Sequence, residues 1–165
     1  MNERAKAVFG GMKDAGIDFV ASVPCVYLKD LLELIDADED IIHVPVTREE
    51  EGVGICAGAF MGGRRTALLM QNSGLGNCIN ALESLDMLYG IPLLMVVSHR
   101  GVEGERVSAQ VPMGLSTEPL LKALKMPAYK PLPKEARKTV REAYGRSERE
   151  GVPAAILLSV VFWRS

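Results

Sequence analysis

Short apolar runs alternate with helical segments along almost the whole chain, and this alternation restricts the fold more than any other feature. Six runs have the length and the aliphatic content of buried strands. They cover residues 18–23, 41–46, 66–71, 92–98, 127–130 and 153–161. Helical spacing of apolar residues predicts helices over residues 2–15, 27–36, 47–61, 78–88, 117–125 and 134–149. Residues 100–116 contain no long apolar run and are expected to be irregular.

Strands that are apolar throughout and separated by helices are typical of a parallel sheet covered on both faces. We therefore expect an α/β fold, a doubly wound, mostly parallel six-stranded sheet with helices on both faces. The length of 165 residues suits one domain, and no repeat or linker divides the chain, so residues 1–165 are expected to form a single domain.

Composition argues against several classes of function. The net charge is -2 without a basic block, and aromatic residues make up only 5% of the chain, which disfavours a nucleic-acid partner. Cys25, Cys56 and Cys78 lie far apart and form no CxxC pair, so we predict no metal site and no disulfide framework. No apolar stretch has signal-peptide or membrane-spanning length, and we expect a cytoplasmic protein.

Polar and glycine-rich segments follow the first four predicted strands. They are residues 24–29, 47–51, 71–77 and 98–110. Ligands of doubly wound sheets bind beyond the carboxyl ends of the strands. We therefore expect these four segments to meet at one edge of the sheet and to form the functional site there.

The acidic segment from Thr47 to Glu51 has two interpretations. Thr47 with Glu50 matches a capping box, and acidic residues in a first helical turn suit the helix dipole. This structural interpretation accounts for Glu50 and Glu51. Glu49 is the alternative, a catalytic carboxylate, although spacing alone favours the structural interpretation for it as well.

The helix that follows carries Gly52, Gly54 and Gly58 in its interior. Each glycine there costs about 0.5–1 kcal/mol relative to alanine, so a close approach of other atoms should offset the cost. A tightly packed subunit interface and simple packing on the sheet both remain open.

The turn NSGLGN, residues 72–77, is a weak signal for phosphate binding. It lacks the Lys-Ser/Thr of a Walker loop and the third glycine of a dinucleotide fingerprint. A glycine turn that only allows the chain to pack is therefore the favoured interpretation from the turn alone.

His99 and Arg100 end a buried strand, where an imidazole and a guanidinium can orient an anionic substrate. His43 lies inside a predicted strand and is expected to be a hydrogen-bonded core residue. Cys25 follows Pro24 at another strand end, but no sequence feature indicates a lowered thiol pKa, so a nucleophilic role is not favoured.

Taken together, these segments resemble the pyrimidine-binding domain of thiamine-diphosphate enzymes. The resemblance is carried, in order, by DFVASVPCVYLKDLL, TREEEGVGICAGAFMGG, ALLMQNSGLGNCINALESL, IPLLMVVSHRG and AQVPMG. Each motif is weak by itself, whereas five in the same order are specific. Within this family, the similarity is to 2-oxoacid decarboxylases that act on sulfopyruvate on the route to coenzyme M, and secondly to those that act on phosphonopyruvate.

The resemblance implies a role for Glu49. In this family an activating glutamate stands nine residues before a helix glycine, and Glu49 and Gly58 have that spacing. Such a glutamate hydrogen-bonds the pyrimidine ring of thiamine diphosphate and drives general acid-base chemistry through the cofactor. The resemblance further implies that residues from two of the four segments bind the cofactor beside Glu49. They are Pro24, Asn72, Ser73, Gly74 and Asn77.

The chain has no GDG...N segment, with which family members hold Mg²⁺ and the diphosphate. The resemblance therefore implies a hetero-oligomer, in which a separate beta subunit holds the Mg²⁺ and shares the cofactor. Candidate substrate-binding residues are Lys29, His99, Arg100 and Gln110. The histidine that relatives carry near Gln110 is missing here, so no proton donor is assigned. A flavodoxin-like nucleotide-binding module without catalysis is the alternative from a different class.

Overall fold

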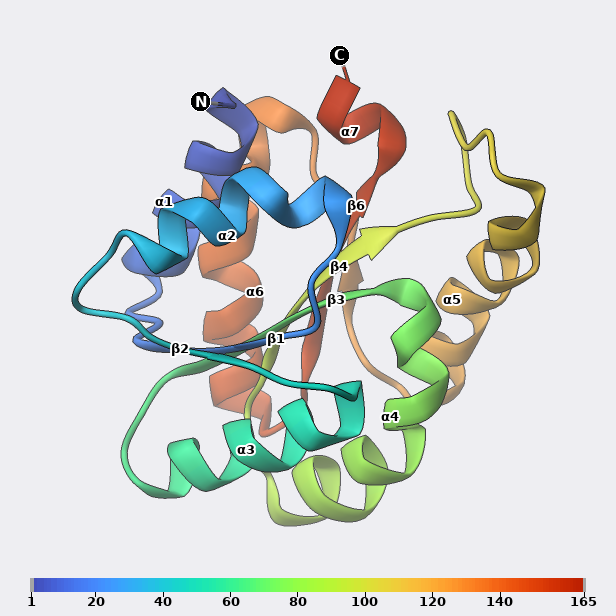
Figure 1. The fold of residues 1–165 in the computed structure, drawn as a ribbon. Helices are drawn as coiled ribbons and strands as arrows, with labels where there is room; N and C mark the ends of the chain where they lie inside the picture. The colour runs from blue at the N-terminus through green and yellow to red at the C-terminus, as the bar shows by residue number, and fades with distance from the viewer. Residues whose placement is uncertain (1, 165) are drawn as a thin grey trace.

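A six-stranded sheet forms the centre of the molecule (Figure 1). The computed structural model describes residues 2–164. The strands lie in the order β2-β1-β3-β4-β6-β5, and every neighbouring pair is parallel. Their bounds are β1 Phe19–Ser22, β2 Ile42–Pro45, β3 Thr66–Gln71, β4 Leu94–His99, β5 Ala128–Tyr129 and β6 Ala154–Ser159. The predicted doubly wound α/β fold is confirmed, and the sheet is parallel throughout.

Helices cover both faces of this sheet. One face carries α1 (Glu3–Asp14), α2 (Lys29–Asp36) and α6 (Ala136–Glu150). The other carries α3 (Glu49–Met61), α4 (Leu75–Ala81) with the π-helical segment η3 (Leu82–Met87), and α5 (Val111–Ala123). Short 3-10 turns are η1 (Val26–Leu28), η2 (Asn72–Gly74), η4 (Ser108–Gln110) and η5 (Pro133–Glu135). Among residues 2–164, no helix is both long and apolar enough to cross a membrane.

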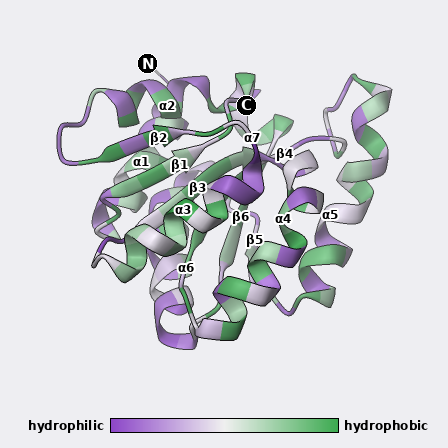
Figure 2. Cartoon of the chain, turned by 60° about the horizontal axis from the view of Figure 1, so that its bottom comes forward, coloured by the Kyte–Doolittle hydropathy of each residue, from purple (hydrophilic) through white to green (hydrophobic). Residues whose placement is uncertain are grey.

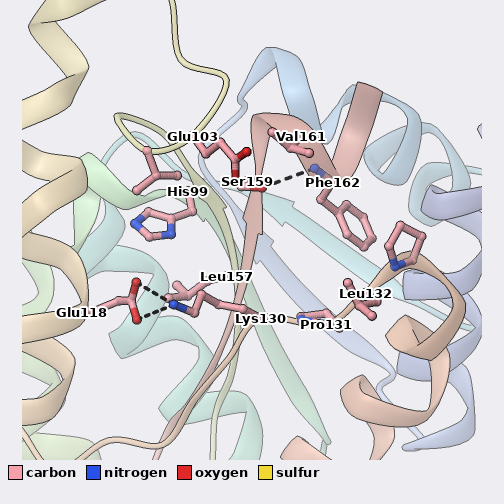
Figure 3. Close-up of a pocket in the computed structure, with 12 residues that line it drawn as sticks. His99, Glu103, Glu118, Lys130, Pro131, Leu132, Leu157, Ser159, Val161 and Phe162 are labelled. Atoms are coloured by element: carbon pink, nitrogen blue, oxygen red, sulfur yellow. Dashed lines mark hydrogen bonds and ion pairs between the residues drawn. The ribbon is translucent and has the colours of Figure 1, made fainter. Parts of the chain in front are cut away.

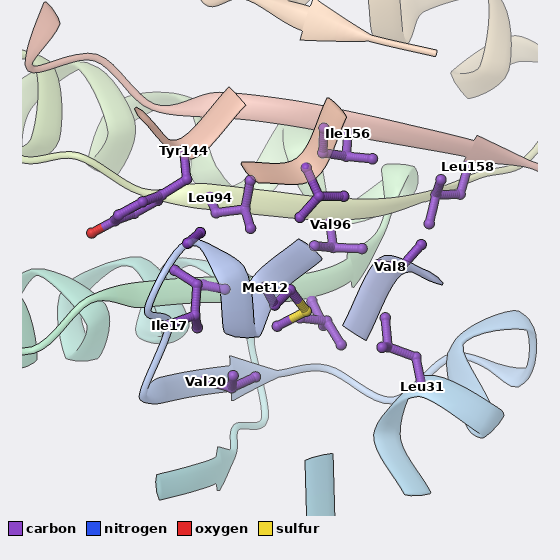
Figure 4. Close-up of a cluster of buried hydrophobic side chains, with 14 of the residues drawn as sticks. Val8, Met12, Ile17, Val20, Leu31, Leu94, Val96, Tyr144, Ile156 and Leu158 are labelled. Carbon is purple, nitrogen blue, oxygen red and sulfur yellow. The ribbon is translucent and has the colours of Figure 1, made fainter. Parts of the chain in front are cut away.

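The core on the α1 face consists of side chains from α1, α2, α6 and the strands of the sheet (Figure 4). Val8 and Met12 of α1 pack with Val20, Val96 and Ile156 of the sheet, and all five are fully buried. The hydropathy view shows strands that are predominantly apolar and helices that alternate apolar and polar residues (Figure 2). This is the pattern expected of a sheet buried on both faces.

Three predicted boundaries are wrong, those before α4 and α5 and the one after β6. The helix predicted from Cys78 already begins at Leu75. The segment before residue 117 is not irregular to its end, because α5 already begins at Val111. Pro112 lies in the first turn of α5, where a proline is tolerated. The predicted strand 153–161 ends at Ser159, and the chain turns directly into α7 (Val160–Arg164).

The glycines of α3 divide into two groups. A Cβ on Gly52 would lie 2.6 Å from Leu68 Cδ1, so this glycine allows α3 to pack closely on β3. A Cβ on Gly54 or Gly58 would meet nothing within 4 Å. Packing on the sheet thus explains only Gly52, whereas Gly54 and Gly58 lie on the outer face of the helix.

Asp86 is an acidic residue inside the core on the α3 face. It lies in the π-helical segment η3 and is only 1% exposed. Neither carboxylate oxygen has a hydrogen-bond partner within residues 2–164. Burial raises the pKa of Asp86 to about 7, because a charge is poorly solvated there.

Candidate functional site

The four segments that follow β1 to β4 meet at the carboxyl edge of the sheet, as predicted. The Cys25 thiol lies 3.8 Å from Gln71 Oε1, which links the segment after β1 to the end of β3. Gln71 Nε2 donates to Gln110 Oε1 at 3.1 Å and so connects β3 to the segment after β4. Asn77 Nδ2 donates to Glu49 Oε2 at 3.0 Å and connects α4 to the start of α3.

Glu49 is the first residue of α3, where the unpaired backbone N–H groups of the helix favour a carboxylate. Its carboxyl group packs directly against Gly74, and a Cβ at Gly74 would overlap Glu49 Cγ, Cδ and Oε1. Asn77, in the first turn of α4, donates to the same carboxylate. Glu49 is therefore held between a glycine and an amide donor, both from the NSGLGN turn.

The predicted capping box between Thr47 and Glu50 is wrong. The N-cap is Arg48, and Glu51 Oε2 accepts hydrogen bonds from the backbone N–H of Thr47 and of Arg48, each at 3.2 Å. Glu50 instead pairs with Arg48 Nε at 2.6 Å. Its Oε2 is buried and has no hydrogen-bond partner within residues 2–164. The helix start therefore accounts for Glu51 and leaves both Glu49 and Glu50 to be explained.

Cys78 lies behind these glutamates and does not supply a reactive thiolate. Burial, followed by the negative charges of Glu49 and Glu50, raises the pKa of its thiol to about 12. The thiol is fully buried in the apolar cluster of the α3 face. Cys78 therefore serves as an apolar packing residue.

Gln71 is a central residue at this edge that sequence patterns do not single out. Besides its contacts to Cys25 and Gln110, its Nε2 donates to Ser73 Oγ at 2.9 Å. The Gln71 side chain thus contacts residues of three of the four segments, namely 24–29, 71–77 and 98–110. Its position as the polar last residue of the apolar run TALLMQ is the signal that could have identified it.

Asn72 is placed differently from the other residues predicted to bind the cofactor. Its side chain is fully buried. The amide oxygen accepts from the backbone N–H of Arg100 at 2.9 Å, and Nδ2 donates to the Arg100 carbonyl and to Thr117 Oγ1. The side chain of Asn72 thus joins β3 to β4 and α5, whereas Ser73 and Asn77 are exposed near Glu49.

Arg100 was predicted to bind substrate, but its guanidinium already has a partner. Its Nε and Nη2 both donate to the carboxylate of Glu105, and the two side chains are only 11% and 4% exposed. The guanidinium also lies 4.9 Å from the centre of the Tyr27 ring. Hydrogen bonds from Arg100, and then from the backbone of residues 101, 106 and 107, hold the pKa of Glu105 well below its usual range. This buried pair fixes the segment after β4.

His99 lines a pocket bordered by residues of α5 and α7 (Figure 3). Its Nε2 donates to the Gly114 carbonyl at 3.3 Å, and burial lowers its pKa, so the imidazole is neutral at pH 7. The pocket has a volume of about 350 Å³, and Lys130 there donates to both carboxylate oxygens of Glu118. The structure thus separates His99 from the contacts around Glu49.

Pro24 and Lys29 border a shallow hollow of about 400 Å³ beside Cys25 and α2. The Lys29 side chain is 72% exposed, and its Nζ lies 3.6 Å from Glu33 Oε1. His43, predicted to be a hydrogen-bonded core residue, contacts Ser22 Oγ at 2.8 Å and Asp36 Oδ1 at 2.5 Å through its two ring nitrogens. His43 is thus satisfied on both sides and is not available for the site.

Comparison with known proteins gives this arrangement a family. Residues 3–120 match the model of the N-terminal TPP-binding domain of thiamine pyrophosphate enzymes. The 2-oxoglutarate:ferredoxin oxidoreductase from Magnetococcus marinus has the same fold, with a TM-score of 0.75 at 13% identity, over 99% of this chain and 29% of that chain. The chain therefore belongs to the class of thiamine pyrophosphate enzymes, as their N-terminal domain.

More similar sequences narrow the family further. The sulfopyruvate decarboxylase subunit alpha of Methanothermobacter thermautotrophicus is 56% identical over 98% of this chain and 98% of the relative. A phosphonopyruvate decarboxylase from Streptomyces viridochromogenes is 37% identical over 64% of this chain and 27% of the relative. The chain is a member of the sulfopyruvate decarboxylase alpha-subunit family. The alternative of a flavodoxin-like module without catalysis receives no support from these relatives.

Proposed function

We propose that this chain is the alpha subunit of a thiamine-diphosphate-dependent decarboxylase that converts sulfopyruvate to sulfoacetaldehyde and CO₂. The observation that carries the proposal is the Glu49 carboxylate, held at the start of α3 between Gly74 and the Asn77 amide. The identity of 56% over nearly the full length of a sulfopyruvate decarboxylase alpha subunit supports the substrate. Sulfoacetaldehyde would then be used on the route to coenzyme M in the cytoplasm.

The residues around Glu49 fit the aminopyrimidine part of thiamine diphosphate. A carboxylate can share a proton with a pyrimidine ring nitrogen, and Gly74 leaves the space that the Glu49 carboxylate fills. Asn77 orients one carboxylate oxygen, which leaves the other for the ring. Pro24 and Ser73 lie on the flanking segments as further cofactor contacts. Asn72 contributes by fixing the end of β3 to β4 through its buried side chain.

The chemical task of Glu49 is to hold a proton at its carboxylate oxygen and to return it during the reaction. Thiamine diphosphate, when bound, supplies a nucleophilic carbon and accepts the electron pair that decarboxylation releases. The end of β3 positions Gln71 beside Gln110, and these two amides form the polar border of the site toward the substrate. Lys29 and His99 are further substrate-side candidates, although they line two different pockets.

We further propose that a beta subunit completes the site by holding the diphosphate and Mg²⁺. Among residues 2–164, no group of three or more His, Cys, Asp or Glu side chains is arranged to hold a metal ion. The outer face of α3 supports the existence of a partner, because Ile55 and Met61 are 39% and 72% exposed beside the open Gly54 and Gly58. Small residues of this kind allow another backbone to approach closely.

The test is co-expression of this chain with a partner that carries a GDG...N segment. Decarboxylation of sulfopyruvate is measured beside phosphonopyruvate, and we expect sulfopyruvate to have the higher kcat/KM. Equal values for both substrates would refute the substrate assignment. Glu49→Gln should abolish turnover. Glu50→Gln is the matched control, and if it lost as much activity as Glu49→Gln, the assignment of the role to Glu49 would fail.

A further inference from the structure

The substrate of the proposed reaction carries a carboxylate and a sulfonate, so its site requires positive charge at the carboxyl edge of the sheet. The present inference rests on that proposed function and concerns the group that meets the sulfonate. Four basic residues lie on the segments 24–29, 47–51, 71–77 and 98–110. They are Lys29, Arg48, Arg100 and Arg106.

Three of these four side chains are paired with a neighbouring carboxylate. Lys29 lies 3.6 Å from Glu33, and Arg48 lies 2.6 Å from Glu50. Arg100 is the most strongly held, since Nε and Nη2, which form one edge of its guanidinium, both donate to a single buried carboxylate. A substrate anion would have to displace that carboxylate, together with its bonds to the backbone, before it could reach Arg100.

The pair of Arg100 and Glu105 instead organises the loop around it. Glu105 accepts from the backbone N–H of Gly101 at 3.2 Å, and of Arg106 and Val107 at 2.9 Å each. The loop also closes at its base, since a Cβ on Gly101 would overlap the backbone of residue 110. One carboxylate therefore fixes the chain on both sides of Glu105, and the loop is preorganised.

Arg106 differs from the other three basic residues. Its backbone is fixed by Glu105, but its exposed side chain has no hydrogen bond or ion pair within residues 2–164. It lies four residues before Gln110, whose amide contacts Gln71 at the site border. Figure 1 shows this segment extending beyond the end of β4 before the chain returns into α5.

We infer that Arg106, and not Arg100, recognises the sulfonate of the substrate and determines specificity for a 2-oxoacid with a second anionic group. A guanidinium offers two parallel N–H donors, which match a sulfonate or another oxyanion. Arg106 holds a full unpaired charge on a fixed backbone. Arg100, by contrast, is neutralised by Glu105 and positions the loop.

The test uses the complex with the beta subunit. KM for sulfopyruvate and the inhibition constant of sulfoacetate, a dead-end sulfonate, are measured for the wild type, Arg106→Gln and Arg106→Lys. We expect Arg106→Gln to raise both constants in parallel by roughly tenfold to a hundredfold, the loss expected for a charge-assisted hydrogen bond, with kcat little changed. Arg106→Lys should recover part of the loss. Lys122→Gln is the control, because Lys122 is an exposed cation in the last turn of α5.

The two possible failures can be told apart. If the wild-type complex does not decarboxylate sulfopyruvate, the proposed function is wrong, and the inference about Arg106, which depends on it, is wrong as well. If the wild type is active but Arg106→Gln leaves KM and sulfoacetate inhibition unchanged, only the inference about Arg106 is overturned. An equal rise in Lys122→Gln would also overturn it, because the effect would then be one of net charge.

Discussion

Replacing Gly74 by alanine tests the geometry of the site at a single added carbon. The backbone of Gly74 is already right-handed helical, with φ -72° and ψ -17°, so alanine brings no backbone strain. Its Cβ would, however, overlap three atoms of the Glu49 side chain. To regain ordinary van der Waals contact, the Glu49 carboxylate has to move by roughly 1 Å.

A displacement of about 1 Å at a reacting group can reduce the rate about a hundredfold, which corresponds to about 2.7 kcal/mol in the activation free energy. We therefore expect Gly74→Ala to lower kcat of the alpha–beta complex by about this factor. The free energy of unfolding should change little, because the displaced group is the end of a flexible side chain. Steady-state turnover and thermal unfolding measure the two quantities separately.

Gly76→Ala is the matched control, two residues further along the same turn. A Cβ on Gly76 would meet nothing within 4 Å, so Glu49 keeps its place. Turnover at saturating partner should stay close to that of the wild type. If Gly74→Ala kept wild-type kcat, or if Gly76→Ala lost as much activity, the reasoning about the Glu49 position would be refuted.

Three further predictions concern packing and ionisation. Gly52→Ala should destabilise the isolated chain by about 1–3 kcal/mol in urea unfolding through overpacking, whereas Gly58→Ala should leave it equally or more stable and weaken association with the partner. Asp86→Asn should raise Tm at pH 8 by roughly 5 °C, because at that pH the Asp86 carboxyl is ionised in both states, and the burial that raises its pKa to about 7 makes this charge unfavourable in the folded state. This gain should shrink as the pH falls toward 4, where both states are protonated. Glu105→Gln should lower Tm at pH 7, and the difference from the wild type should shrink progressively below about pH 4, because the unfolded carboxyl then takes up a proton while the folded one, with its depressed pKa, stays ionised.

The outcomes that contradict these predictions are equally specific. Equal destabilisation by the Gly52 and Gly58 variants would mean that α3 does not have one packed and one open face. A Tm difference for the Asp86 variant that does not change with pH would exclude titration as its cause. For Glu105, a difference from the wild type that persists unchanged at pH 3 would show that the loss is one of packing and not of an ionised carboxylate.

The sequence predicts the sheet well because its strands are buried on both faces. Continuous apolar runs such as TALLMQ leave no alternative to a central strand, and the parallel order follows from the helices between them. The meeting of four polar segments at one edge follows from the same topology. The prediction for Glu49 came from a family resemblance, since its spacing alone could not separate it from a helix start.

The parts that the sequence does not predict depend on tertiary contacts. The early start of α5 depends on Gly114, which allows the helix to pack against the backbone of residues 100 and 101. The partner of Arg100 lies five residues further along an irregular loop, where no periodic rule brings two side chains together. The capping box was predicted one residue too early, at Thr47 and Glu50. In the structure the N-cap is Arg48, and Glu51 accepts the hydrogen bond from its backbone N–H.

We propose that Glu49 provides the proton-sharing carboxylate of a site that two subunits complete. The most direct measurement is the rate at which the C2 proton of thiamine diphosphate, bound to the alpha–beta complex, exchanges with deuterated water, followed by NMR after acid quench. We expect Glu49→Gln to slow this exchange by at least about a hundredfold, in the range typical of lost general acid-base catalysis, while the cofactor stays bound. Exchange at the wild-type rate in Glu49→Gln would contradict it.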